Sequence, residues 1–223
     1  DASSLFNVIT GYSRPPEYQH FIVAPHGMRS FFVYMIRQEI ENAKKGLPSG
    51  ITVKVNSLVD PELIELLYEA SQAGVQIKMI VRGICCLIPG IEGVSENITV
   101  ISIVGQLLEH SRIFRFENAG NPRIYMGSAD WMPRNLDRRV ELVFPIEDEK
   151  QKARAFSILD TMLSDTTNAR YMQSDTSYVH VDLRGKQKIS SQLTFYREAQ
   201  ERLKALQAIE KDSVLIPIHS ADE

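Results

Sequence analysis

The stretch ITVKVNSLVDPELIELLYEASQAGVQIKMIVRG, residues 51–83, decides the fold class of this chain. Ile51–Val55 alternates apolar and polar side chains, as a strand does. Asp60 and the proline after it are residues that cap and begin a helix, and the helical pattern ends at Gly74. Val75–Val81 is a second predicted strand. Strand, helix and strand in this order form a β-α-β unit, which is typical of an α/β domain.

Strand-like and helix-like segments continue on both sides of this unit. Upstream, the pattern predicts a strand at 21–24 and a helix at 28–45. Downstream, it predicts strands at 98–104, 112–116, 123–126 and 140–146, a helix at 148–163, short strands around 178–183 and a polar helix at 190–209. We therefore expect a mixed β-sheet flanked by helices on both faces. The expected boundaries are a linker over 1–18, one domain over 19–209 and a tail over 210–223.

The composition narrows the class of protein. Of 223 residues, 43% are hydrophobic and 24% charged, which suits a globular domain and excludes a disordered or fibrous chain. The formal net charge of -3 lacks a general basic excess, so any polyanion site must be local. Cys85 and Cys86 are adjacent, a spacing that fits neither a disulfide framework nor a zinc site and favours a reducing compartment. With no transmembrane run and no targeting signal at the start, we expect a cytoplasmic protein.

Two positions combine residue types that suit phosphate chemistry. Arg82 follows the second strand of the β-α-β unit, and ligands favour the carboxyl edge of such strands. His110 is followed two residues later by Arg112, so the two side chains share one side of an extended segment. A guanidinium binds phosphate oxygens in a bidentate manner, and an imidazole exchanges a proton near neutral pH. We therefore expect a phosphate site around these residues.

A polar segment after a later predicted strand strengthens this interpretation. Residues 127–130 are Gly-Ser-Ala-Asp, and small residues at a strand end let backbone amides and a hydroxyl approach an anion. Between residues 109 and 139, six arginines stand against four carboxylates, a local positive excess in an acidic chain. The alternative is a solvated loop whose arginines pair with those carboxylates.

These motifs resemble those of a known superfamily. His-x-Arg followed by Gly-Ser-x-Asp resembles the second half of the phospholipase D-like motif, His-x-Lys with a downstream Gly-Ser-x-Asn, with Arg112 for lysine and Asp130 for asparagine. Longer strings are similar to the last domain of bacterial polyphosphate kinases, a family within that superfamily. These strings are FNVITGYSR (6–14), NSLVDP (56–61), IVRGICCL (80–87), LEHSRI (108–113) and SADWMPRNLDRR (128–139). The resemblance extends from Leu5 to about Leu206.

The resemblance implies an activity and residue roles. In this family, ATP and inorganic polyphosphate exchange a phosphoryl group reversibly through a phosphohistidine in an upstream domain. The last domain supplies an arginine, here Arg82, and a second essential histidine, here His110, to the nucleotide phosphates. Further residues expected to line the phosphate site are Arg112, Ser128, Arg134 and Arg138. A carboxylate, Glu141 or Asp137, is expected to orient and tune His110.

The resemblance also implies what lies outside these residues. The chain begins with Asp, and the phosphorylated histidine of the upstream domain is absent from it. Mg²⁺ is expected as a cofactor, held by the nucleotide or the upstream domain, with no metal ligand here. The expected partners are ATP, ADP, inorganic polyphosphate and the upstream domains, and not nucleic acid. We expect this half of an active site to be inactive alone, and the full-length protein to be a homo-oligomer associated with the membrane surface.

Two alternative functions fit part of the pattern. A phospholipase D-like phosphodiesterase would need an intact His-x-Lys and, for nucleic acid, a basic face with interleaved aromatic residues, whereas this chain has Arg112, net acidity and one tryptophan. A folding or oligomerisation module would use the late helix. Its Leu203, Leu206 and Ile209 recur at three-residue steps, with Phe195 upstream, and could pack on another subunit or on the missing domains. The module is compatible with the kinase assignment, since an excised domain can fold without being active.

Overall fold

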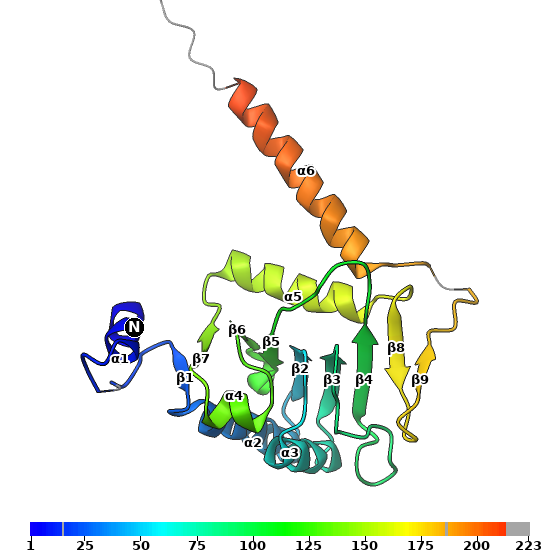
Figure 1. Ribbon diagram of the computed structural model, residues 1–223. Coiled ribbons are helices and arrows are strands. Elements are labelled where there is room, and N and C mark those ends of the chain that lie inside the picture. Colours follow the sequence, from blue (N-terminus) through cyan, green and yellow to red (C-terminus); the bar gives the residue numbers. More distant parts are fainter. Residues whose placement is uncertain (15, 186, 213–223) are drawn as a thin grey trace, which may run out of the picture.

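A single mixed sheet of nine strands forms the centre of the computed structural model, which describes residues 1–14, 16–185 and 187–212 (Figure 1). Its strands are β1 (Ile22–Ala24), β2 (Gly50–Val55), β3 (Gln76–Val81), β4 (Ile98–Ile103), β5 (Ile113–Phe116), β6 (Arg123–Gly127), β7 (Glu141–Pro145), β8 (Ala169–Met172) and β9 (Tyr178–His180). They follow the order β1-β7-β6-β5-β2-β3-β4-β8-β9. The strands β2, β3 and β4 are parallel, and every other neighbouring pair is antiparallel.

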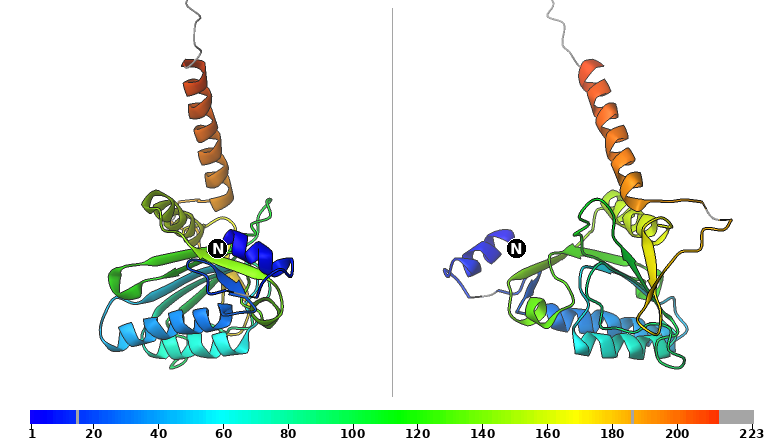
Figure 2. Two further views of the ribbon diagram at one scale, coloured as in Figure 1. Left: turned by 90° about the vertical axis from the view of Figure 1, so that its left-hand side faces the viewer. Right: turned by 45° about the vertical axis from the view of Figure 1, so that its right-hand side comes forward.

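Helices cover both faces of this sheet, which confirms the predicted α/β class. They are α1 (Ala2–Ile9), α2 (Met28–Lys44), α3 (Pro61–Gln72), α4 (Pro133–Asp137), α5 (Glu149–Leu163) and α6 (Ser191–Asp212), with one 3-10 turn at Asn118–Gly120. The pair α2 and α3 lies against one face, and α5 lies against the other (Figures 1 and 2). The sheet is therefore closed to solvent on both sides over its central strands.

Each face of the sheet has its own apolar core. Under α2 and α3, the fully buried rings of Phe32 and Trp131 meet edge to face with centroids 5.3 Å apart. On the other face, α5 contributes the fully buried Leu159. The alternation of side chains along β4 serves both cores, since Val100 joins the first and Ile101 the second. This two-sided burial explains why the central strands are so rich in Val and Ile.

Two buried carboxylates fix where helices and strands begin. Asp60 caps α3 by accepting a 3.1 Å hydrogen bond from the backbone N–H of Leu63, as the sequence predicts. Glu39 on α2 accepts from the N–H of Gly50 at 2.9 Å and of Asn118 at 2.7 Å, which ties the start of β2 to the end of β5. Burial raises the pKa of Glu39.

The two ends of the chain carry helices that stand apart from the sheet (Figures 1 and 2). Within the segment expected as a linker lies α1, which buries none of its residues. The late helix predicted at 190–209 is α6, which continues to Asp212 into the expected tail, while 213–223 lie outside the described residues. Leu203 and Leu206 are exposed, and the side chain of Ile209 lies outside the described part. No described helix is long and apolar enough to span a bilayer.

Candidate functional site

The sheet topology brings the candidate residues to one edge. The carboxyl ends of the parallel strands β2, β3 and β4 share this edge, β5 and β7 begin there, and β6 ends there. Arg82, after β3, therefore lies at the same edge as His110 and Arg112, which precede β5. Ser128 and Asp130, which follow β6, complete the group.

A nearly buried ion pair joins Arg112 to Asp130 at this edge. Nε and Nη2 of Arg112 donate to the two carboxylate oxygens at 3.2 and 2.9 Å, and the side chains are 11% and 9% exposed. Asp130 also accepts a 2.7 Å hydrogen bond from the backbone N–H of Asn56, directly after β2. A bidentate pair fixes the plane of the guanidinium. The two departures from the phospholipase D-like motif are therefore bonded to each other.

The same guanidinium holds His110. Nη1 of Arg112 lies 2.9 Å from Nδ1 of His110 and donates to the His110 carbonyl oxygen at 2.8 Å. Because arginine is always a donor, Nδ1 is the acceptor, and the hydrogen of the neutral imidazole is then on Nε2. His110 itself is exposed to solvent. A fixed tautomer with an Nε2–H group suits hydrogen-bond donation to a phosphate oxygen.

Lys54 fixes the backbone on both sides of His110. It lies within β2 and is only 1% exposed. Its ammonium donates to the carbonyl oxygen of Ser111 at 2.9 Å and to that of Glu109 at 3.4 Å. Burial lowers the pKa of Lys54 to about 8. A buried cation thus supports the histidine through the main chain.

Two further side chains hold the same loop. Gln192, at the start of α6, donates to the Leu107 carbonyl oxygen at 2.7 Å and accepts from the Leu107 N–H at 3.0 Å. The Glu109 carboxylate accepts from Ser111 through Oγ at 2.5 Å and through the backbone N–H at 3.1 Å. The loop is therefore ordered by polar contacts, although Leu107 is itself largely exposed.

Arg82 is connected to the ion pair through Asn56. Nε of Arg82 donates to Oδ1 of Asn56 at 2.9 Å. The backbone of Gly83 packs closely on β2, since a Cβ there would lie 2.9 Å from the Asn56 carbonyl oxygen. The close approach of the Gly83 backbone is therefore to the residue that follows β2. One chain of hydrogen bonds thus links Arg82, Asn56, Asp130, Arg112 and His110.

Glu141 contacts Ser128 and Asn135. Their hydroxyl and amide groups donate to its two carboxylate oxygens, and the Ser128 hydroxyl oxygen accepts from the N–H of Leu142 at 3.1 Å. We expected Glu141 to orient His110, but β6 separates β7 from β5, so this carboxylate binds residues beside β6. Any influence of Glu141 on the site therefore acts through Ser128.

Asp137 belongs to a different ionic cluster. It accepts hydrogen bonds from Arg29 on α2 at 2.7 and 2.6 Å, and the same guanidinium binds Asp60 at 2.9 and 2.6 Å. The hydrogen bonds from Arg29 hold the pKa of Asp137 below its ordinary value. These contacts tie α4 to α2 and α3. The nearby Arg134 and Arg138, expected to line the site, are both exposed.

A family model described as polyphosphate kinase C-terminal domain 2 matches residues 21–192. The chain belongs to the polyphosphate kinase family. It is similar to the polyphosphate kinase of Lactiplantibacillus plantarum, with 50% identity over 205 residues that cover 92% of this chain and 29% of that protein. With the polyphosphate kinase of Escherichia coli K12 it shares 44% identity over 192 residues, covering 86% of this chain and 28% of that protein. The chain corresponds to the C-terminal domain of these phosphotransferases and spans less than a third of their length.

Solved structures agree with this assignment. The crystal structure of polyphosphate kinase from Porphyromonas gingivalis matches with a TM-score of 0.87 at 35% identity, covering 92% of this chain and 32% of that one. Nuc from Salmonella typhimurium, a phospholipase D family member, matches with a TM-score of 0.50 at 13% identity, covering 69% of this chain and 97% of that one. The second likeness shows the fold alone. It confirms the predicted phospholipase D-like architecture of this polyphosphate kinase domain.

Lys54 and Asn56 are polar residues of the site that sequence reasoning missed. Lys54 is at a polar position of the alternating segment Ile51–Val55, and this alternation predicts that Lys54 faces solvent. Its burial could therefore not be predicted from the pattern. Asn56 lies in the string NSLVDP, which marked the family resemblance but gave no role to the amide. The signal that was available is the position of Asn56 directly after a predicted strand, as for Arg82.

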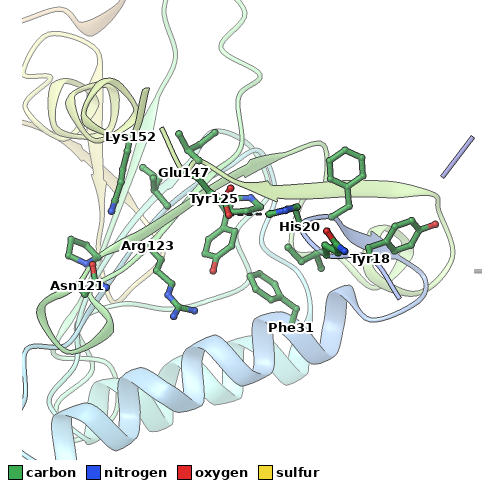
Figure 3. A pocket seen from close by; sticks show the side chains of 15 residues that line it. Tyr18, His20, Phe31, Asn121, Arg123, Tyr125, Glu147 and Lys152 are labelled. Atoms are coloured by element: carbon green, nitrogen blue, oxygen red, sulfur yellow. Dashed lines mark hydrogen bonds and ion pairs between the residues drawn. The ribbon is translucent and has the colours of Figure 1, made fainter. Parts of the chain in front are cut away.

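A different cavity of about 600 Å³ lies at the other end of the sheet, lined by β1, β6, β7 and α2 (Figure 3). Arg123, Tyr125 and Lys152 line this cavity. His20 and Glu147 also line it, with Nδ1 of His20 3.1 Å from a carboxylate oxygen of Glu147. None of the candidate residues at the phosphate edge lines this cavity. We therefore do not assign it to the same site.

Proposed function

We propose that this domain is the nucleotide- and phosphate-binding half of a polyphosphate kinase active site. The reaction is the reversible transfer of the ATP γ-phosphate to inorganic polyphosphate through a phosphohistidine of an upstream domain. In the first step the P–O bond to ADP breaks as a P–N bond forms. In the second, the P–N bond breaks as a terminal polyphosphate oxygen binds the phosphorus. The phosphohistidine and the other catalytic groups are assigned to upstream domains, which correspond to the part of the relatives' length that this chain does not cover.

The hydrogen-bond chain from Arg82 to His110 is the observation that carries this proposal. Among the described residues, Arg82 forms no ion pair with a carboxylate, so its charge is available to phosphate oxygens. His110 has its Nδ1 occupied by Arg112 and its hydrogen on Nε2, which suits hydrogen-bond donation to the leaving phosphate oxygen. We assign His110 as the catalytic residue and Arg82 as the principal phosphate ligand.

The remaining candidates receive narrower roles. Arg112 positions His110 and, with its Nε, Nη1 and Nη2 already bonded, keeps one Nη2 hydrogen for a phosphate oxygen. Ser128 gives its hydrogen to Glu141, so it offers a phosphate only a secondary contact. The exposed Arg134 and Arg138 supply long-range positive charge to incoming substrate.

Mg²⁺ is proposed to arrive with the nucleotide. No group of three or more His, Cys, Asp or Glu side chains in the described part of the chain is placed to hold a metal ion. The carboxylates beside the site are already bound: Asp130 to Arg112, Glu109 to Ser111, and Glu141 to Ser128 and Asn135. These residues therefore do not fit a resident magnesium site, and the proposed steps use none.

The proposed setting follows from family membership. The partners are ATP, ADP, inorganic polyphosphate and the upstream domains of a longer polypeptide, with no nucleic acid. The relatives' length supports the upstream domains, since the matched region is 29% of the Lactiplantibacillus plantarum protein. We assign this domain to a cytoplasmic homo-oligomer that associates with the membrane surface.

A domain exchange tests the function. The matched segment of the Lactiplantibacillus plantarum relative would be replaced by this chain, and ATP-dependent polyphosphate synthesis measured in the hybrid. The 50% identity over 205 residues makes the junctions tractable. We expect synthesis by the hybrid and none by this chain alone. With His110→Ala we expect at least about a hundredfold loss, the lower end of what one preorganised hydrogen-bond donor contributes.

A matched substitution controls for nonspecific effects. His20→Ala removes another exposed histidine, at the opposite end of the sheet, and should leave synthesis unchanged. Unimpaired synthesis with His110→Ala, in a hybrid that folds normally, would refute the assigned role. Synthesis by the isolated chain that is lost with His110→Ala would refute the half-site.

A further inference from the structure

A second cationic cavity, of about 430 Å³, opens beside Arg82 at the same edge of the sheet. Its lining includes Arg82, Ser102, Asn168, Arg170, Tyr178 and His180. In the sheet order, β3 separates β2 and β5 from β4, β8 and β9. Arg82 therefore has His110 on one side and this cavity on the other.

The strand register arranges the cavity residues in a row. Ser102 on β4 is directly opposite Arg170 on β8, and Arg170 is directly opposite His180 on β9. Directly opposed residues of antiparallel strands point to the same face, about 5 Å apart. Ser102 also donates through Oγ to the Arg82 carbonyl oxygen at 3.2 Å. The row thus continues outward from the predicted nucleotide-phosphate ligand.

The two arginines of this cavity have no carboxylate partner among the described residues. Neither Arg82 nor Arg170 forms an ion pair there, whereas Arg29, Arg112 and Arg115 are each paired with a carboxylate. No Asp or Glu is among the described lining residues. The Thr167 hydroxyl and the second amide hydrogen of Asn168 supply further hydrogen-bond donors, whereas the hydroxyls of Ser102 and Tyr178 already donate to Arg82 and Met172. A concave, cationic, donor-rich surface in an acidic chain fits an external polyanion.

The shape of this donor row favours a linear polyanion over a nucleoside. A base would prefer apolar and aromatic walls, but only Val104 and Tyr178 offer them here. A chain of condensed phosphates presents oxyanions along its whole length, which matches donors repeated from strand to strand. We propose that this cavity is a subsite for the internal phosphates of a polyphosphate chain whose end lies at Arg82 and His110. This inference rests on the proposed function.

Charge removal at the far end of the row tests the subsite. The variant Arg170→Gln/His180→Gln keeps polar side chains at two exposed positions, so it should fold as the parent does. Binding of long-chain polyphosphate, tripolyphosphate and Mg-ADP would be measured by titration calorimetry at fixed salt. We expect long-chain polyphosphate to bind about tenfold more weakly or worse, and Mg-ADP to change by less than about twofold.

Two further variants make the result specific. Arg123→Gln/His20→Gln removes the same residue types from the cavity at the opposite end of the sheet and should change neither affinity. Arg82→Gln should weaken the binding of both long-chain polyphosphate and Mg-ADP, because both ligands are proposed to contact Arg82.

The outcomes separate the subsite from the proposed function. Unchanged long-chain binding by Arg170→Gln/His180→Gln, with Mg-ADP still dependent on Arg82, would overturn the subsite and leave the function standing. If this variant lost affinity equally for Mg-ADP and for long-chain polyphosphate, the cavity would be part of the nucleotide site, and the proposed subsite would also be overturned. A parent chain that binds neither ligand would overturn both proposals.

Discussion

Replacing Asp130 with alanine should destabilise the fold by about 3–5 kcal/mol, the usual cost of breaking a buried ion pair from one side. Asp130 accepts two hydrogen bonds from Arg112 and one from the backbone N–H of Asn56. Its removal leaves a guanidinium that is 11% exposed without a counter-charge. It also leaves the buried Asn56 N–H without its acceptor. Both groups lie where water cannot readily replace the carboxylate.

Urea unfolding of the purified chain, followed by circular dichroism, measures this loss. With a slope of about 2 kcal/mol per molar urea, the midpoint should fall by about 2 M. Asp130→Asn keeps an oxygen acceptor and should lose less. Adding Arg112→Met to Asp130→Ala removes the orphaned charge and should recover part of the loss in a double-mutant cycle. A loss below about 1 kcal/mol for Asp130→Ala would show that the pair is solvated and that the argument is wrong.

The other predictions concern the loop of His110 and the exposed arginines. The fold lowers the pKa of Lys54 from 10.5 to about 8, so between these pH values the unfolded chain binds more protons and stability rises with pH. Lys54→Met should remove this rise, on the order of 3 kcal/mol, in urea unfolding across that window; an unchanged profile would contradict the burial of the charge. Gln192→Ala should speed amide hydrogen exchange at Leu107 and its neighbours, with no change in the strands; equal rates would disprove the clamp. Arg134→Ala and Arg138→Ala should each change stability by less than about 0.5 kcal/mol but weaken Mg-ADP binding, and this loss of affinity should be larger at low salt than at high salt. A loss of affinity that is the same at every salt concentration would show that neither arginine acts through long-range charge.

Most of the secondary structure could be predicted from the sequence because its elements carry strong local signals. The cap and proline at Asp60, and the alternation before and after them, predict α3 between β2 and β3. The residues of α1, α4 and β8 were not predicted. The elements α4 and β8 have only five and four residues, too few for a clear apolar period. The helix α1 is eight residues long and carries apolar side chains, but it buries none of them.

The site could be predicted only where two residues are close in sequence or follow strands. The spacing of His110 and Arg112 foretold their contact, and the position of Arg82 foretold the edge on which it lies. The partners of Glu141 and Asp137 depend on strand order and on helix packing. The sequence could not show that β6 separates Glu141 from His110, or that Arg29 of α2 reaches Asp137.

The central claim is that Arg82 and His110 form a phosphate site in this domain. The most direct test is a titration of the chain with Mg-ADP, watching its five histidine imidazoles by two-dimensional NMR and repeating it with Arg82→Ala. We predict that the signals of His110 alone shift and that the shift weakens in the variant. If His110 does not respond, or responds equally without Arg82, the two residues do not form a common site and the account is contradicted.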